Sequence, residues 1–121
     1  MPGGKQSAWA NLRVWEEYLV GSSGRQLLCV NRRTGKLLWR VEAARDSLYL
    51  AVGGGKVFCA ELPAPRGKED PSGGSIFALD LATGRRVWER AGGSWLRYSA
   101  RLDLVVTPTG FYRGSDGQPL P

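Results

Sequence analysis

The stretch "LDLATGRRVW", residues 79–88, has a near twin 49 positions earlier in "VNRRTGKLLW", residues 30–39. In each copy an Asn or Asp is followed three residues later by a Thr-Gly pair, and a Trp stands four residues after the Gly. The residues in these positions are Asn31, Thr34, Gly35 and Trp39 in the first copy, and Asp80, Thr83, Gly84 and Trp88 in the second. Such a repeat has to be interpreted before single elements are assigned, because it indicates a repeat architecture.

Each copy predicts a β-hairpin. The Asn or Asp side chain can accept hydrogen bonds from backbone amides two residues on, which starts a turn, and Gly supplies the positive φ that ends it. The strand before the turn is apolar on both faces, which is typical of a sheet packed between other sheets. A degraded third copy, "FYRGSDGQPLP" at residues 111–121, aligns Gly117 with Gly84 and Asp116 with Thr83.

Further strands precede the second hairpin. "DSLYLAV" and "KVFCAE" have strand character and are joined by the glycines of "VGGGKV". That glycine stretch lacks the spacing of a phosphate-binding loop and a following helix, so we interpret it as a turn. Residues 62–74 are rich in Pro, Gly and charge and predict a surface loop. The second unit is therefore predicted to have four strands, at about residues 47–52, 56–61, 75–80 and 85–90.

The other two units follow the same scheme. "VWEEYLV" precedes the first hairpin, and "WLRYSA" and "LDLVVTP" precede the third. The predicted fold class is all-β, with three four-stranded antiparallel sheets and no clear helix, although residues 6–18 are ambiguous. We expect the first sheet to lack its outermost or innermost strand, with Glu16 and Glu17 as strand neighbours on opposite faces. The predicted boundaries are 1–13 for an N-terminal segment, then about 14–41, 47–90 and 95–121 for the sheets.

The composition excludes several classes of function. The chain of 121 residues has room for one domain, and it contains no histidine, which removes Ser-His-Asp and Cys-His catalysis and histidine metal ligation. Cys29 and Cys59 lie in apolar surroundings, so we interpret them as buried free thiols, with a disulfide as the alternative.

The start of the chain, "MPGGKQSAWANLR", lacks the apolar stretch of a secretion signal, and the sequence contains no run of about 18 apolar residues. As written, the chain is expected to be soluble and cytoplasmic, without a membrane span. A periplasmic or envelope location remains open for a chain whose natural N-terminus lies further upstream.

The charge balance allows a nucleic-acid partner but does not favour one. The net charge is +6, and a basic balance can attract nucleic acid. However, no basic tract interleaved with aromatic residues is present, as nucleic-acid binding would favour. The arginines that flank the repeated turns are expected to be solvated. These arginines are Arg32, Arg33, Arg85 and Arg86.

The repeat resembles the blades of the pyrroloquinoline-quinone (PQQ) type of β-propeller. In that family the Trp that ends a blade docks between adjacent blades, which implies inter-blade contacts for Trp39 and Trp88. A propeller closes with about four to eight blades, so three blades imply an incomplete ring, part of a longer protein or of an assembly. The residues that carry the resemblance are Val30, Asn31, Thr34, Gly35 and Trp39 in the first copy, and Ala78, Leu79, Asp80, Thr83, Gly84 and Trp88 in the second.

The same resemblance leaves two functions open. The motif occurs in quinoprotein dehydrogenases, which hold PQQ with calcium and acidic or amide ligands, and in outer-membrane assembly scaffolds of the BamB kind. The first function is a non-catalytic scaffold that binds a protein partner or missing blades. The second is part of a PQQ-dependent oxidoreductase whose cofactor site lies outside this chain.

The side chains that could act in catalysis or bind a cofactor favour the scaffold function over the oxidoreductase. The aspartates stand singly, with Asp80 expected to cap a turn and Asp103 to begin a strand. We therefore expect no catalytic, cofactor-binding or metal-binding residue in this chain, and self-association through its outer sheets. The aspartates considered are Asp46, Asp70, Asp80, Asp103 and Asp116, and the aromatic residues assigned mainly to packing are Trp9, Trp15, Tyr49, Trp95, Tyr98 and Phe111.

Overall fold

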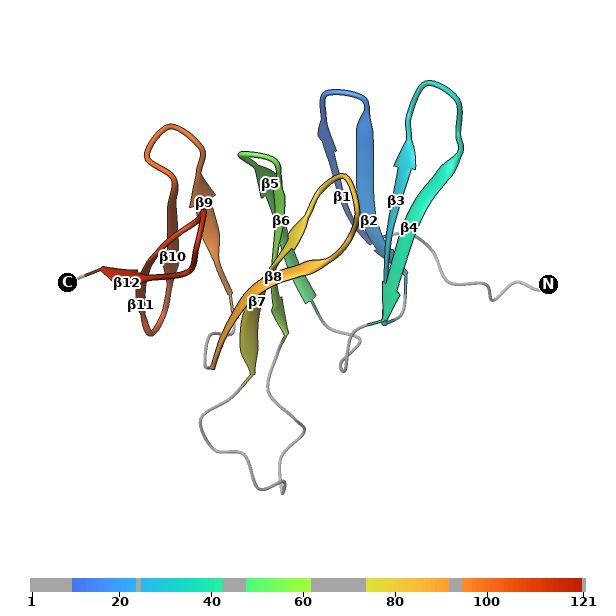
Figure 1. The fold of residues 1–121 in the computed structure, drawn as a ribbon. Coiled ribbons are helices and arrows are strands. Elements are labelled where there is room, and N and C mark those ends of the chain that lie inside the picture. Colours follow the sequence, from blue (N-terminus) through green and yellow to red (C-terminus); the bar gives the residue numbers. More distant parts are fainter. Residues whose placement is uncertain (1–9, 24, 43–47, 62–73, 92–94, 121) are drawn as a thin grey trace, which may run out of the picture.

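The computed structural model describes residues 10–23, 25–42, 48–61, 74–91 and 95–120. These residues form twelve strands in three four-stranded antiparallel sheets, and none of them is helical. The sheets stand side by side in chain order, as blades do (Figure 1). The predicted all-β class and the three-sheet architecture are confirmed.

We name the sheets blades 1, 2 and 3. Within each blade, consecutive strands pair as hairpins. Blade 1 consists of β1 (Ala10–Trp15), β2 (Tyr18–Ser23), β3 (Gln26–Asn31) and β4 (Leu37–Glu42). Blade 2 consists of β5 (Leu48–Gly53), β6 (Lys56–Glu61), β7 (Ser75–Asp80) and β8 (Arg86–Ala91). Blade 3 consists of β9 (Arg97–Ser99), β10 (Leu104–Thr107), β11 (Gly110–Arg113) and β12 (Pro119–Leu120).

Blade 1 is complete, and the expectation that it lacks a strand is wrong. The stretch "VWEEYLV" holds two strands, because Glu16 and Glu17 form the turn between β1 and β2. Glu16 has a φ of 57°, the left-handed conformation that such a tight turn demands. The two glutamates are therefore not strand neighbours. The part of the ambiguous stretch 6–18 that the structure describes contains no helix.

In blade 2 the predicted strands agree with the structure to within one residue, and Gly54 and Gly55 form the predicted turn. Most of the predicted loop, residues 62–73, lies outside the described residues.

In blade 3, Asp103 was expected to begin a strand, but β10 begins at Leu104. Asp103 lies in the preceding turn with a φ of 51°.

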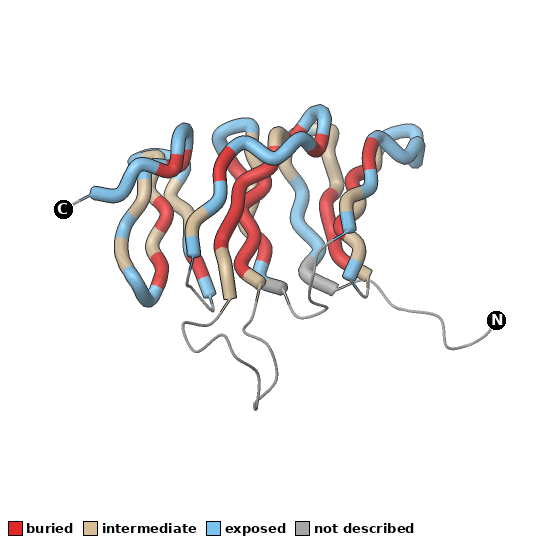
Figure 2. Tube along the Cα trace, turned by 60° about the horizontal axis from the view of Figure 1, so that its bottom comes forward, coloured by how far each residue is buried: buried red, intermediate tan, exposed pale blue. Residues whose placement is uncertain are grey.

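The first strands of the blades approach one another, β1 next to β5 and β5 next to β9, and the sheets fan out from there. The turns that contain Gly35 and Gly84 lie at the same edge of this fan (Figure 1). Blade 2 is sandwiched between the other two, and its strands β6 and β7 are almost entirely buried (Figure 2). This position explains why those strands are apolar on both faces.

Two hydrophobic cores fill the spaces between the blades. The core between blades 1 and 2 contains Val20, Leu27, Cys29 and Trp39 from blade 1, and Leu50, Val57, Cys59, Phe77, Leu79 and Leu81 from blade 2. The core between blades 2 and 3 contains Phe58, Ala60, Ile76, Ala78 and Trp88 from blade 2, and Leu96 and Val105 from blade 3.

Both cysteines are buried in the first core as free thiols, which confirms the first interpretation over the disulfide. Burial raises the pKa of the Cys29 thiol to about 11. Burial also raises the pKa of the Cys59 thiol, which is fully enclosed. Because the thiolate is the reactive form, neither cysteine is suited to nucleophilic or redox chemistry.

Candidate functional site

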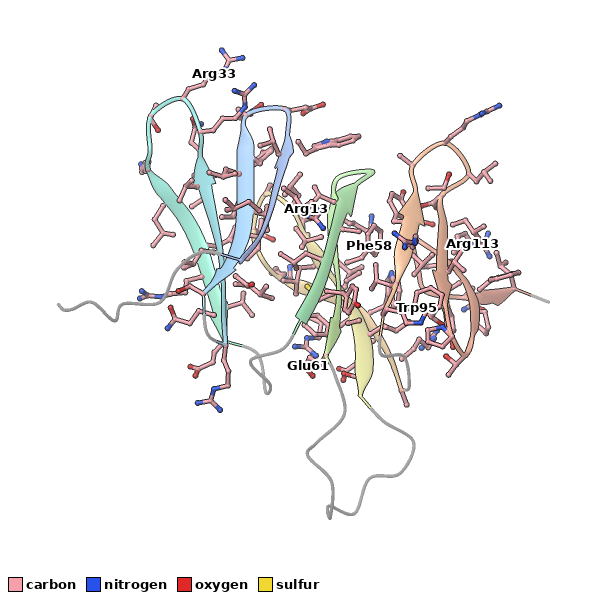
Figure 3. The ribbon with its side chains drawn as sticks, turned by 180° about the vertical axis from the view of Figure 1, so that it is seen from behind. Arg13, Arg33, Phe58, Glu61, Trp95 and Arg113 are labelled. Carbon is pink, nitrogen blue, oxygen red and sulfur yellow. The ribbon has the colours of Figure 1, made fainter. Side chains whose placement is uncertain are left out.

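The repeated turn of blade 1 is built by the side chains that the sequence motif singles out. The Asn31 Oδ1 accepts hydrogen bonds from the amides of Arg33 at 2.9 Å and Thr34 at 3.2 Å. The Thr34 hydroxyl accepts from the Lys36 amide at 3.2 Å. The Gly35 amide donates to the Asn31 carbonyl at 2.7 Å, with Gly35 at a φ of 78°. The turn therefore satisfies its own backbone groups and leaves Arg33 at its tip (Figure 3).

The turn of blade 2 repeats this geometry. Asp80 Oδ1 accepts from the amides of Ala82 at 2.9 Å and Thr83 at 3.2 Å, and Thr83 Oγ1 accepts from Arg85 at 3.2 Å. Asp80 is thus a turn cap, as the sequence predicts. Since its carboxylate is occupied with backbone amides, it has a structural role at the edge of the blade.

The corresponding turn of blade 3 has the same backbone conformation as the turns of blades 1 and 2, but different side chains stabilise it. Arg113 stands where the other turns have Asn31 or Asp80 and cannot accept the amide hydrogen bond. The Oδ2 of Asp103, from the turn between β9 and β10, accepts it from Ser115 at 3.1 Å instead. Asp116 takes the role of the threonine and accepts from the Gln118 amide at 3.1 Å. The repeat motif could not predict that Asp103 accepts this hydrogen bond, because Asp103 lies on another hairpin.

In blades 2 and 3, the glycine of the repeated turn, Gly84 or Gly117, is covered by a tryptophan of the preceding blade. The Trp39 Nε1 of blade 1 donates to the Leu81 carbonyl of blade 2 at 2.7 Å, and the ring lies against Gly84. A Cβ built on Gly84 would lie 2.7 Å from Trp39 Cδ2, so only glycine fits beneath this ring. Trp39 is 7% exposed as a result.

The contact between blades 2 and 3 has the same design. The Trp88 Nε1 donates to the Gly114 carbonyl at 2.8 Å, and the ring lies on Gly117 so closely that a Cβ there would overlap it. Arg90 adds a hydrogen bond from its Nε to the Gly117 carbonyl at 2.8 Å. A buried indole whose N–H is satisfied combines a large apolar contact with directional specificity.

An aromatic and acidic cluster supports the same seam from the inner side. The Phe58 ring lies between blades 2 and 3 (Figure 3), with its centroid 4.2 Å from that of Tyr98. The Tyr98 hydroxyl donates to Asp103 Oδ1 at 2.8 Å. Burial, assisted by this hydrogen bond and by the charge of Asp103, raises the pKa of Tyr98 to about 12. Tyr98 therefore stays protonated at neutral pH and acts as a donor that holds Asp103 in place.

Three of the aromatic residues assigned to packing are exposed, so that assignment is wrong for Tyr49, Trp95 and Phe111. Trp15 and Tyr98 do pack against the cores, and Trp9 lies outside the described residues. Tyr49 and Trp95 line a recess of about 220 Å³ together with Leu96 and Arg97.

The described residues do not bring together a ligand set for a calcium-bound quinone. Within the described parts of the chain, no three Cys, Asp or Glu side chains come close enough to hold a metal ion. Asp80 and Asp103 are occupied with turn amides, while Asp46 and Asp70 lie outside the described residues. The arginines that flank the turns are exposed, as expected, and Arg86 is paired with Glu89 at 2.8 Å.

The outward faces of the fan carry apolar side chains that no described residue covers. On blade 1, Leu12 is 49% and Val14 is 58% exposed, although both belong to a strand. On blade 3, Phe111 of β11 is 46% exposed.

Together, the four-stranded sheets, their radial fan and the tryptophan contacts define an incomplete β-propeller. The chain belongs to the family described as outer membrane protein assembly factor BamB, whose model matches residues 16–114. Among proteins with curated functions, none matches this sequence. No helix in the described ranges has the length and apolar character needed to cross a membrane.

Solved structures show the same architecture. BamB from Moraxella catarrhalis has a TM-score of 0.62 and 26% identity, with 87% of this chain and 32% of that chain covered. The quinohemoprotein alcohol dehydrogenase ADHIIG from Pseudomonas putida HK5 has a TM-score of 0.65 and 14% identity, over 91% and 25%. A europium-containing methanol dehydrogenase has a TM-score of 0.66 and 16% identity, over 89% and 30%. The chain thus spans at most about a third of these proteins, and the two dehydrogenases show the fold alone.

Proposed function

We propose that this chain is a non-catalytic run of three propeller blades that acts as a protein-interaction scaffold within a larger set of blades. The observation that carries the proposal is the outward face of blade 1. A monomeric soluble protein rarely leaves a contiguous apolar strand face open, and such faces mark interaction sites. Leu12 and Val14 lie on that face and are about half exposed.

Two further observations support a scaffold over an enzyme. The polar side chains that could do chemistry, such as Asp80 and Asp103, are bound to backbone amides. The tryptophans and glycines of the repeat are used to join blades, and we propose that Trp39 and Trp88 are docking residues of the propeller. The description of the family as an assembly factor agrees with a role in protein interaction.

Light scattering at several protein concentrations tests this proposal. The isolated chain is expected to self-associate through its apolar faces, and Val14→Glu should reduce the association without unfolding the chain. Leu102→Glu is the matched control, because Leu102 is 68% exposed in the turn between β9 and β10, away from these faces. A monomer of constant mass at every concentration would contradict the proposal.

A further inference from the structure

The inference concerns the inner edge of the fan, where the first strands of the three blades approach one another, and it rests on the proposed function. Arg13, Ala51 and Arg97 occupy the same position in β1, β5 and β9, because each stands two residues before the end of its strand. Both β1 and β9 lie next to β5. The inner edge therefore carries an arginine on each side of a small residue of the middle blade.

The two arginines have no acidic partner among the described residues. Arg13 and Arg97 are both exposed, and neither belongs to an ion pair with a described residue. The Arg13 Nη1 donates to the carbonyl of its neighbour Leu12 at 2.9 Å. Because a guanidinium carries five N–H donors, most of its hydrogen-bonding capacity stays available for a carboxylate.

Two exposed aromatic rings lie beside these charges. Tyr49 is 48% exposed and Trp95 is 37% exposed. Both line the recess of about 220 Å³, together with Leu96 and Arg97. Tyr and Trp are enriched in protein interfaces, because each combines a large apolar surface with a polar group that can stay wet.

A second recess, of about 290 Å³, continues the first one toward blade 1. It shares Tyr49, Leu96 and Arg97 with the first recess and reaches Arg13 and Ala51. Ala51 carries only a methyl group, so blade 2 places no long side chain between the two arginines at this position. Figure 3 shows Arg13 and Trp95 on opposite sides of β5. We name the two recesses together the inner-edge groove.

We infer that the inner-edge groove binds a segment of a protein partner in which acidic residues alternate with apolar residues. The guanidinium groups of Arg13 and Arg97 pair with carboxylates of the segment, and Tyr49 and Trp95 pack against its apolar side chains. Both recesses are open to solvent. A small-molecule site encloses most of its ligand, so the open groove suits a peptide segment better.

The composition of the groove also favours a protein over a nucleic acid. Single-stranded nucleic acid requires a basic groove that follows its backbone, in addition to stacking rings. Here the positive charge comes from Arg13 and Arg97 alone, and the other residues that line the two recesses are uncharged. Two separate charges with apolar and aromatic surface between them match a short acidic and apolar segment.

The test measures binding of a labelled peptide to the full chain by fluorescence anisotropy at low ionic strength. The probe is a fluorescein-labelled decapeptide of alternating Asp and Leu residues. A decapeptide of alternating Asp and Gly residues has the same charge without the apolar side chains. The chain is used below the concentration at which light scattering detects self-association.

Arg13→Gln and Arg97→Gln are each expected to weaken binding of the Asp-Leu peptide about fivefold. Arg33→Gln is the matched control, because it removes the same charge at the tip of the blade 1 turn, away from the groove (Figure 3). This control should change the affinity little. Trp95→Ala should reduce the preference for the Asp-Leu peptide over the Asp-Gly peptide.

Equal losses for the three arginine variants would mean that net charge alone attracts the peptide, and this result or an absence of binding would overturn the inference. Equal affinities of the unaltered chain for the two peptides would contradict the part assigned to Tyr49 and Trp95. Tighter binding of a labelled oligothymidylate, weakened by Arg13→Gln and Arg97→Gln, would place a nucleic acid in the groove and overturn the choice of partner. Failure of the proposed function is recognised separately, by a constant monomer mass in light scattering.

Discussion

The indole nitrogen of Trp39 donates a 2.7 Å hydrogen bond to the carbonyl oxygen of Leu81, which lies 42 residues later in the chain and on the next blade. Trp88 and Gly114 repeat this relationship one blade further on, at 2.8 Å. The tryptophan that ends one hairpin is therefore bound by the turn of the next. Each blade is joined to its neighbour by a large buried ring whose only polar group is satisfied.

Trp88→Ala should destabilise the chain by roughly 3 to 5 kcal/mol, as truncation of a large buried aromatic residue does. Because a domain of this size has only about 5 to 15 kcal/mol of stability, the variant should be poorly folded. Urea unfolding followed by circular dichroism measures the change. Trp95→Ala is the matched control with little expected effect, since Trp95 is exposed. An unchanged midpoint for Trp88→Ala would mean that the ring does not hold blades 2 and 3 together.

Gly84→Ala and Gly117→Ala should cost more stability than Gly55→Ala. All three glycines have positive φ, so alanine carries a backbone cost of about 1 kcal/mol at each position. At Gly84 and Gly117 the methyl group also displaces a tryptophan ring, whereas at Gly55 it meets no described atom within 4 Å. Thermal unfolding compares the three variants. Equal losses at all three positions would show that the rings are not seated on these glycines.

Tyr98→Phe should make the stability of the chain less dependent on alkaline pH. The pKa of Tyr98 is raised from 10.0 to about 12, so the folded state holds the phenol proton more tightly than the unfolded state does. The resulting stabilisation is complete below about pH 10 and is lost as the pH rises to about 12. Urea unfolding across this range measures the slope. Tyr49→Phe is the control, since Tyr49 is exposed, and it should leave the slope unchanged.

The chain should bind neither PQQ nor calcium in isothermal titration. The described residues bring together no set of acidic or thiol ligands for the ion, and Asp80 and Asp103 are already bound to backbone amides. Stoichiometric binding of either ligand would contradict the scaffold and would favour the oxidoreductase alternative. Buried free thiols at Cys29 and Cys59 give no support to that alternative.

Much of the architecture could be predicted from local sequence alone. Asn31 and Asp80 start their turns through hydrogen bonds that span two or three residues, and Gly35 and Gly84 end them at positive φ. Such interactions depend on spacing along the chain, so the repeat was enough to predict the hairpins. The turn between β1 and β2 was not predicted, because Glu16 adopts a positive φ there and no glycine marks the position. The end of β1 was therefore missed.

Only the tertiary structure decided which residues of different hairpins and different blades meet. Asp103 caps the turn at Ser115 because two hairpins pack side by side, and no spacing rule connects a carboxylate to an amide twelve residues away. The same holds for exposure. Tyr49 and Phe111 are large aromatic residues of the kind that usually pack in a core, yet both are exposed among the described residues. The sequence determined the hairpins through local backbone chemistry, while the packing of one sheet on the next determined which tryptophan lies on which glycine and which apolar faces remain open.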